Sequence, residues 1–99
     1  MGQVYIEELS QHEGQEVTIK GWLYNRRSSG KIQFLLVRDG TGIVQAVMVK
    51  KEVSLESFAL ARELTQESSI IVKGIVRPDE RAPGGYELTL TNLELVHMA

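Results

Sequence analysis

The sequence contains no cysteine, which excludes disulfide bonds and thiolate metal sites from its 99 residues. Its two histidines, His12 and His97, lie far apart without a pattern of carboxylates around them, so no metal site is expected. No apolar run approaches the roughly 20 residues that a membrane-spanning helix needs. The N-terminus MGQVYIEE also lacks the basic and apolar regions of a signal peptide. We therefore expect no membrane association and, by default, a cytoplasmic location.

An excess of positive charge is also lacking, since 11 Lys and Arg face 13 Asp and Glu. This balance disfavours a nonspecific binder that follows phosphates along a strand, because such proteins depend on counterion release. A chain of 99 residues makes one domain, residues 1–99, too small to include a kinase-sized active site. No nucleophile, base and orienting group can be assembled from it, so no catalytic residue and no bound cofactor is expected in this chain.

One stretch nevertheless has a local excess of positive charge. The stretch from Lys20 to Arg38 has five basic residues and no acidic one. It overlaps the segment YNRRSSGKIQFLLVRDGTGIVQ, residues 24–45, which joins a basic pair, two turns, a phenylalanine and a glutamine set among aliphatic residues. We expect the other elements to hold this segment in place.

Five segments have the pattern of a β-strand, either by alternation of apolar and polar residues or as short apolar runs bounded by turn residues. They are residues 16–24, 32–38, 43–49, 69–76 and 86–96. Gly21 predicts a bend or bulge where one strand serves two sheets. Trp22 is interpreted as core or barrel-end packing, since large aromatic side chains are usually mostly buried. Ser28, Ser29 and Gly30 predict a hairpin turn.

Helical patterns occur in two places. LESFALARELT, with Ser54 as N-cap, predicts about three turns of helix between the third and fourth strands. Its buried face is predicted to contain Leu55, Phe58, Ala59 and Leu64. Residues 4–14 predict a short N-terminal helical turn on the barrel end. This order indicates an all-β fold with one helix, the five-stranded Greek-key barrel called an OB-fold; an SH3-like barrel, which normally lacks that helix, is the alternative.

OB barrels commonly bind oligonucleotides on strands two and three, although the same fold also binds sugars and proteins. Phe34 can stack on a base, Arg27 can donate two hydrogen bonds, and Gln45 can donate and accept. Strand 32–38 is apolar on both faces, so Phe34 is either covered, which burial statistics favour, or exposed for use. Gln45 is either an edge residue or a hydrogen-bonding group beside Phe34.

Two long runs also carry a family resemblance. GWLYNRRSSGKIQFLLVRDGTGIVQAVMV (residues 21–49) and KGIVRPDERAPGGYEL (residues 73–88) resemble the N-terminal anticodon-binding domain of class IIb aminoacyl-tRNA synthetases, most closely the asparaginyl type. The likeness covers essentially the whole chain. It implies that Phe34 stacks on the central anticodon uridine, that Arg27 and Gln45 bond the same base, and that Glu87 contacts the first anticodon base. A supporting basic surface would comprise Arg26, Lys31 and Arg77.

The same resemblance implies a longer parent protein, because the catalytic half of such synthetases is absent from these residues. That parent would be a homodimeric ligase that attaches asparagine to tRNA with ATP and Mg²⁺. The partners of this chain would be the tRNA anticodon loop and the catalytic domain of the same polypeptide. The RAPGGYEL segment favours asparagine over aspartate, which is the second choice. A stand-alone binder of single strands and a protein-interaction scaffold are the other two hypotheses.

Overall fold

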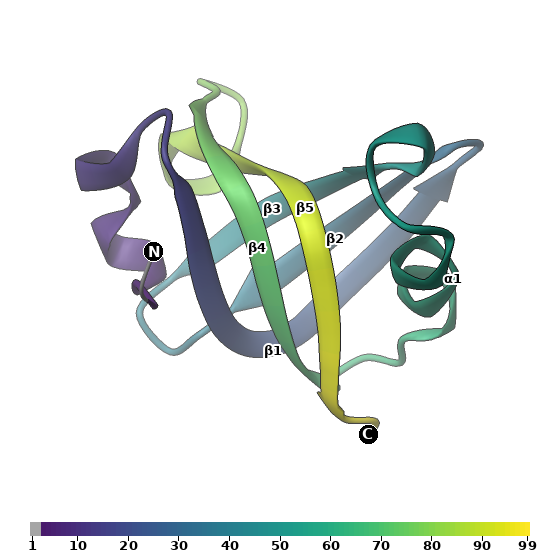
Figure 1. Cartoon of the computed structure of the whole chain (residues 1–99). Helices are drawn as coiled ribbons and strands as arrows, with labels where there is room; N and C mark the ends of the chain where they lie inside the picture. The colour runs from purple at the N-terminus through teal and green to yellow at the C-terminus, as the bar shows by residue number, and fades with distance from the viewer. Residues whose placement is uncertain (1–2) are drawn as a thin grey trace.

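Five strands close into a barrel in the order β1-β2-β3-β5-β4 in the computed structural model, which describes residues 3–99 (Figure 1). The strands are β1 (Glu16–Ser29), β2 (Ile32–Arg38), β3 (Ile43–Val49), β4 (Ser69–Pro78) and β5 (Tyr86–His97). Neighbouring strands are antiparallel except for β3 and β5, which are parallel. The predicted OB-fold is confirmed, with the barrel fully closed.

The helices occupy the predicted places. Helix α1 (Leu55–Glu63) lies between β3 and β4, and the 3₁₀ helix η1 (Ile6–His12) precedes β1. Two short 3₁₀ turns, η2 (Lys50–Glu52) and η3 (Pro83–Gly85), follow β3 and precede β5. Within residues 3–99, no helix is long and apolar enough to pass through a membrane.

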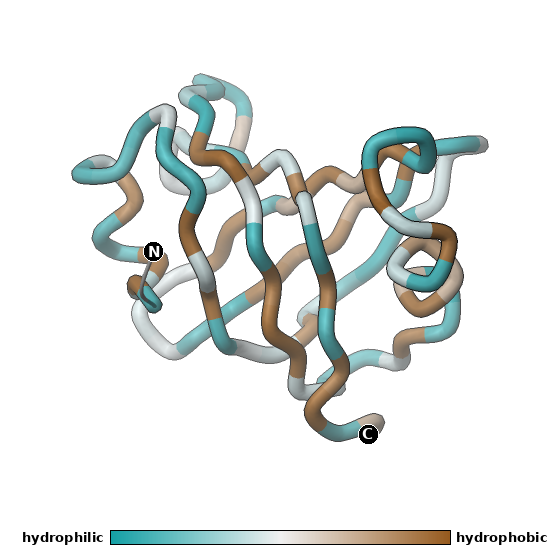
Figure 2. Tube along the Cα trace, viewed as in Figure 1, coloured by the Kyte–Doolittle hydropathy of each residue, from teal (hydrophilic) through white to brown (hydrophobic). Residues whose placement is uncertain are grey.

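The core fills the inside of the barrel with alternate residues of β2, β3 and most of β4, and of shorter parts of β1 and β5. Hydrophobic and hydrophilic residues are therefore interspersed along the strands (Figure 2). Inward side chains on β1 and β2 include Val17, Ile19, Leu23, Leu35 and Val37, all at most 1% exposed. This period-two burial is what lets the outward side chains of the same strands form a separate surface.

Strand β1 is longer than its alternation predicted, because it serves both sides of the barrel. Its first half, residues 16–22, pairs with β4, and its second half, residues 22–29, pairs with β2. The two halves meet at Trp22, next to Gly21, where the bend was predicted. Trp22, however, faces outward and is 41% exposed, so its predicted burial is wrong. Its neighbours Gly21 and Leu23 take the inward positions, and a strand cannot turn adjacent residues to the same face.

Helix α1 covers one end of the barrel with a different face from the one predicted. Phe58, Ala61 and Leu64 are buried, whereas Leu55 is 74% exposed and Ala59 is exposed. Positions 57, 58, 61 and 64 form the stripe at i, i+1, i+4 and i+7 that meets the barrel. Phe58 and Leu64 confirm part of the prediction, whereas the predicted burial of Leu55 and Ala59 is wrong.

The start of α1 depends on one side-chain hydrogen bond. The Ser54 hydroxyl oxygen accepts from the Ser57 amide nitrogen at 3.0 Å, as its predicted N-cap role requires. We expect Ser54→Ala to lower the free energy of unfolding by about 0.5–2 kcal/mol, because an amide of the first turn loses its acceptor. Urea denaturation measures the change. The control is Ser10→Ala, at an exposed position in η1, which should stay within about 0.5 kcal/mol of the wild type. Equal stabilities for the two variants would contradict the assignment.

Candidate nucleic-acid interface

Phe34 lies on the outer face of β2. Its chain neighbours Gln33 and Leu35 point into the barrel and are 1% and 0% exposed, whereas Phe34 is partly exposed. The sequence pattern left open whether Phe34 is covered or exposed, and the structure places it on the outside of the barrel. The odd-numbered residues of β2 fill the interior of the barrel, so the Phe34 ring is free of the core on at least one side.

Arg27 lies directly opposite Phe34 in the pairing of β1 with β2. The central carbon of its guanidinium group is 4.1 Å from the centroid of the Phe34 ring. This is a close cation–π contact, which holds a positive charge against an outward aromatic face. Among residues 3–99, the ion pair that forms involves Arg38 and not Arg27, so the Arg27 charge is not neutralised by a carboxylate.

Gln45 lies on the outer face of β3, opposite Leu36 on β2 and Glu87 on β5. Because β3 is paired on both sides here, Gln45 is not an edge residue. Its amide nitrogen donates a hydrogen bond to a Glu87 carboxylate oxygen at 3.3 Å. Gln45 also helps to line a small open hollow of about 100 Å³ whose floor includes Phe34 and Leu36. The complete lining is Asn25, Arg26, Arg27, Phe34, Leu36 and Gln45.

The pairing register explains why these residues meet. Asn25, Leu36, Gln45, Glu87 and Arg77 form a continuous row across β1, β2, β3, β5 and β4. A second row, two residues along, contains Arg27 and Phe34. Asn25 and Leu36 were not among the residues singled out from the sequence. Only the cross-strand register, which depends on an irregularity between Leu23 and Asn25, brings them to the hollow.

The three supporting basic residues lie at different places around this surface. Arg26 pairs with the inward-facing Leu35 and donates from its Nε to the Leu64 carbonyl oxygen at 3.3 Å, so it reaches the hollow only at its rim. Lys31 is exposed at the turn between β1 and β2. Arg77 is opposite Glu87 and donates from its Nε to the Thr89 hydroxyl at 3.0 Å. Arg77 thus flanks Glu87 on the side away from Gln45.

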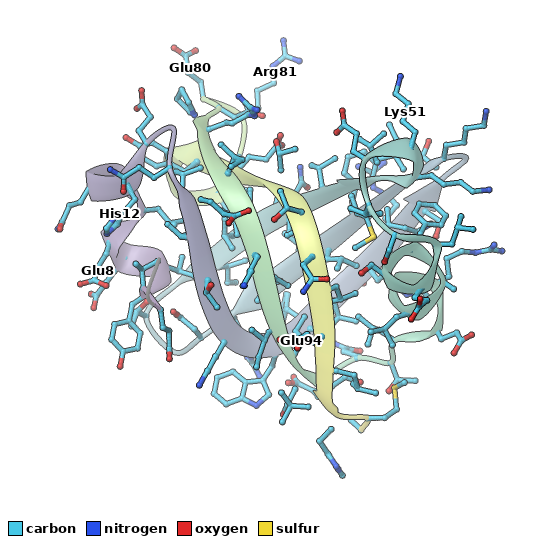
Figure 3. The ribbon with its side chains drawn as sticks, viewed as in Figure 1. Glu8, His12, Lys51, Glu80, Arg81 and Glu94 are labelled. Atoms are coloured by element: carbon cyan, nitrogen blue, oxygen red, sulfur yellow. The ribbon has the colours of Figure 1, made fainter. Side chains whose placement is uncertain are left out.

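Charged residues elsewhere are dispersed over the surface. Glu8 and His12 lie on η1, while Glu80 and Arg81 project from the loop between β4 and η3 (Figure 3). The part of the chain that the structure describes contains no group of three metal-ligating side chains placed to hold an ion. The arrangement of Phe34, Arg27 and Gln45 instead suits a planar group with hydrogen-bonding edges, which is the chemistry of an unstacked base.

The chain is similar in sequence and structure to known nucleic-acid-binding domains and synthetases. The tRNA anticodon family, described as an OB-fold nucleic acid binding domain, matches residues 17–96. The asparagine–tRNA ligase of Pelotomaculum thermopropionicum is 59% identical over 100% of the chain and 23% of that relative. The asparagine–tRNA ligase of Desulforamulus reducens is 63% identical over 95% of the chain and 22% of that relative.

A solved structure of the same type of enzyme is also similar to this chain. The asparaginyl-tRNA synthetase from Pyrococcus horikoshii superposes with a TM-score of 0.91 and 46% sequence identity, over 98% of this chain and 23% of that one. The chain therefore spans less than a quarter of the length of these three relatives.

Proposed function

Because the chain belongs to the tRNA anticodon family of OB-fold nucleic-acid-binding domains, we propose that it binds a tRNA anticodon loop on the outer face of β1, β2 and β3. The central anticodon base would lie in the hollow between Phe34, Arg27 and Gln45. The observation that carries this proposal is the Arg27 guanidinium held 4.1 Å from the ring of an outward-facing phenylalanine. Stacking and a local positive charge are the two requirements for holding a single-stranded base.

The hydrogen-bonding groups favour uridine at the central position. One N–H of the Gln45 amide is bonded to Glu87, which orients the amide; its carbonyl oxygen can then accept from a base, and its second N–H remains a donor. Uridine offers an N3–H donor to that oxygen and two carbonyl oxygens to the Arg27 guanidinium. Cytidine carries an unprotonated N3, which would face the Gln45 oxygen with a lone pair. The site would therefore discriminate between the two pyrimidines through one proton.

Glu87 would read the neighbouring first anticodon base. A carboxylate accepts two hydrogen bonds, and guanine presents two adjacent N–H groups on its Watson–Crick edge. The 3.3 Å bond between Gln45 and Glu87 couples the two positions, since the same carboxylate orients the amide that meets the central base. Arg77, on the other side of Glu87, would supply positive charge for a phosphate, and Lys31 and the rim residue Arg26 would do so at the opposite end.

The amino acid specificity follows from the relatives rather than from these residues. Anticodons for asparagine, aspartate and lysine share a central uridine, so Phe34, Arg27 and Gln45 cannot distinguish them. The similarity to asparagine–tRNA ligases favours asparagine, with aspartate as the alternative. In a parent of that type, a catalytic domain of the same polypeptide would join asparagine to tRNA with ATP and Mg²⁺, as a cytoplasmic homodimer in protein biosynthesis.

The test is a titration of the chain with an RNA anticodon stem-loop bearing GUU. A stem-loop that differs only in a central cytidine should bind more weakly by about 1–3 kcal/mol, or roughly 5- to 150-fold, because a paired donor and acceptor are lost. Oligouridine serves as a competitor at constant salt. Competition equal to that of the stem-loop would identify a stand-alone binder of single strands. Tight binding of a protein without any affinity for RNA would identify a scaffold instead.

A further inference from the structure

A second arginine lies near an aromatic ring on the same face as Arg27 and Phe34. The guanidinium carbon of Arg38, at the end of β2, is 5.4 Å from the centroid of the Tyr24 ring on β1. Tyr24 is 40% exposed, and Trp22, which pairs directly with Arg38, is 41% exposed. An aromatic pair and an arginine therefore form an open surface outside the hollow. We call Trp22, Tyr24 and Arg38 the aromatic strip.

The aromatic strip continues the surface of the hollow along both strands. Arg38 lies four residues after Phe34 on β2, a separation of about 13 Å at the usual strand rise. Tyr24 lies at the irregularity of β1, next to Asn25, which already lines the hollow. Tyr24 is accordingly between the Phe34 position and Trp22. An extended single strand places successive bases at separations that such a surface can follow, as stacking platforms on OB-folds do.

The charge of Arg38 is held by a carboxylate, unlike that of Arg27. The Arg38 Nη2 atom is 2.8 Å from one Glu67 carboxylate oxygen and 3.1 Å from the other. Both side chains are nearly half exposed, so this ion pair contributes little to stability. Glu67 has a left-handed backbone, with φ of 72°, and its amide donates to the Leu23 carbonyl oxygen at 2.7 Å. The loop before β4 thus brings a carboxylate to the aromatic strip.

We propose that the aromatic strip is a second base-stacking site, which takes an unpaired nucleotide adjoining the base held at Phe34. The inference rests on the proposed function, because it extends the same RNA along the same face. The base would stack on Tyr24 beside Trp22, and its phosphate would exchange with Glu67 for the Arg38 guanidinium. The carboxylate keeps Arg38 in place in the free chain, and exchange for a phosphate preserves its charge-assisted hydrogen bonds.

The decisive variant is Tyr24→Leu, which keeps apolar bulk on β1 and removes the flat ring. We expect it to weaken binding of the GUU stem-loop roughly 5- to 150-fold, while Tyr24→Phe binds as the wild type does. Tyr5→Leu is the matched control, since Tyr5 is 51% exposed before η1 and is not part of the strip, and it should bind normally. Circular dichroism and thermal unfolding establish that each variant is folded.

Abasic RNAs identify the nucleotide that occupies the aromatic strip. Removing the base on one side of the central uridine should weaken wild-type binding and leave Tyr24→Leu binding almost unchanged. Equal losses in both proteins at every neighbouring position would overturn the inference. Binding of Tyr24→Leu as tight as that of the wild type would also overturn it, and a protein partner would then be the better occupant of the strip. If Phe34→Ala still weakens binding in that case, the proposed function stands; if no RNA binds the wild type, both proposals fall.

Two further measurements test the strip without removing its ring. Trp22 is the single tryptophan of the chain, so its fluorescence reports on this surface alone. Its emission should change as the stem-loop saturates the protein, and constant emission through a saturating titration would contradict the proposal. Glu67→Gln should tighten binding and steepen its dependence on salt, because a freed Arg38 neutralises a phosphate without first losing a carboxylate. An unchanged salt dependence would exclude the exchange at Arg38.

Discussion

Replacing Phe34 with alanine is expected to weaken binding of the GUU stem-loop by about 1–3 kcal/mol, roughly 5- to 150-fold. The ring is the only stacking surface on the floor of the hollow, and its loss also leaves the Arg27 guanidinium without the face on which it now rests. The change should be measured at one fixed salt concentration, because phosphate contacts vary strongly with salt. Fluorescence anisotropy of a labelled stem-loop gives the dissociation constants directly.

Two matched variants show whether stacking is the cause. Phe34→Tyr retains the ring and should bind like the wild type, while Phe34→Leu retains apolar bulk and should bind like the alanine variant. Phe58, the other phenylalanine of the chain, lies on the buried face of α1 and is 5% exposed, so Phe58→Leu should lower stability without a specific loss of RNA affinity. An unchanged dissociation constant for Phe34→Ala, in a folded protein, would remove the basis of the proposed function.

The strands could be predicted because segments such as β2 and β3 are short, mostly apolar runs bounded by turn residues. The side of Phe34 could not be predicted, since the outward positions of β2 are apolar as well. Ile32, Phe34 and Leu36 are each only partly exposed, because outward neighbours such as Arg27 and Gln45 cover them. The covering side chains belong to β1 and β3, so the sequence of β2 alone cannot show that its outward residues are partly covered.

The sequence alone also cannot tell which of two neighbouring arginines faces the hollow. Arg26 and Arg27 are indistinguishable by composition, yet one pairs with the inward Leu35 and the other with the outward Phe34. An irregularity between Leu23 and Asn25 sets which arginine faces the hollow. A shift by one residue would exchange their roles, since successive side chains of a strand point to opposite faces. The assignment of Arg27 therefore came from the family resemblance, and the register gives it a physical reason.

The exposure of Trp22 follows from the bend of β1. Closing the barrel requires β1 to pair with β4 and then with β2, and the inside of that turn has room for the hydrogen of Gly21 alone. The large ring next to it is therefore placed on the outside of the turn. A general tendency of tryptophan to be buried is overruled by a local steric requirement, which the sequence signals only through the adjacent glycine.

Gly21→Ala is accordingly expected to be strongly destabilising. A methyl group at this position would overlap the carbonyl oxygen of Arg38 and lie 3.1 Å from its carbonyl carbon and 3.2 Å from the Val37 Cγ1 atom. The oxygen belongs to the backbone of β2 and can yield only if the two strands separate at the bend. Overpacking of this kind costs about 1–3 kcal/mol. For a domain of this size, each kcal/mol lowers the melting temperature by roughly 4–8 °C.

The comparison with Gly42→Ala isolates the role of the backbone contact. A methyl group there would lie 3.1 Å from the Ile6 Cγ2 atom, which belongs to a side chain and can move aside. Urea denaturation should therefore show a clearly smaller loss for Gly42→Ala than for Gly21→Ala. Since the contact is with the carbonyl group of Arg38 itself, the Gly21 variant should also disturb the aromatic strip before it disturbs Phe34. Equal stability of the two variants would mean that β1 can separate from β2 at the bend without cost, and the bend would then not fix the position of Trp22.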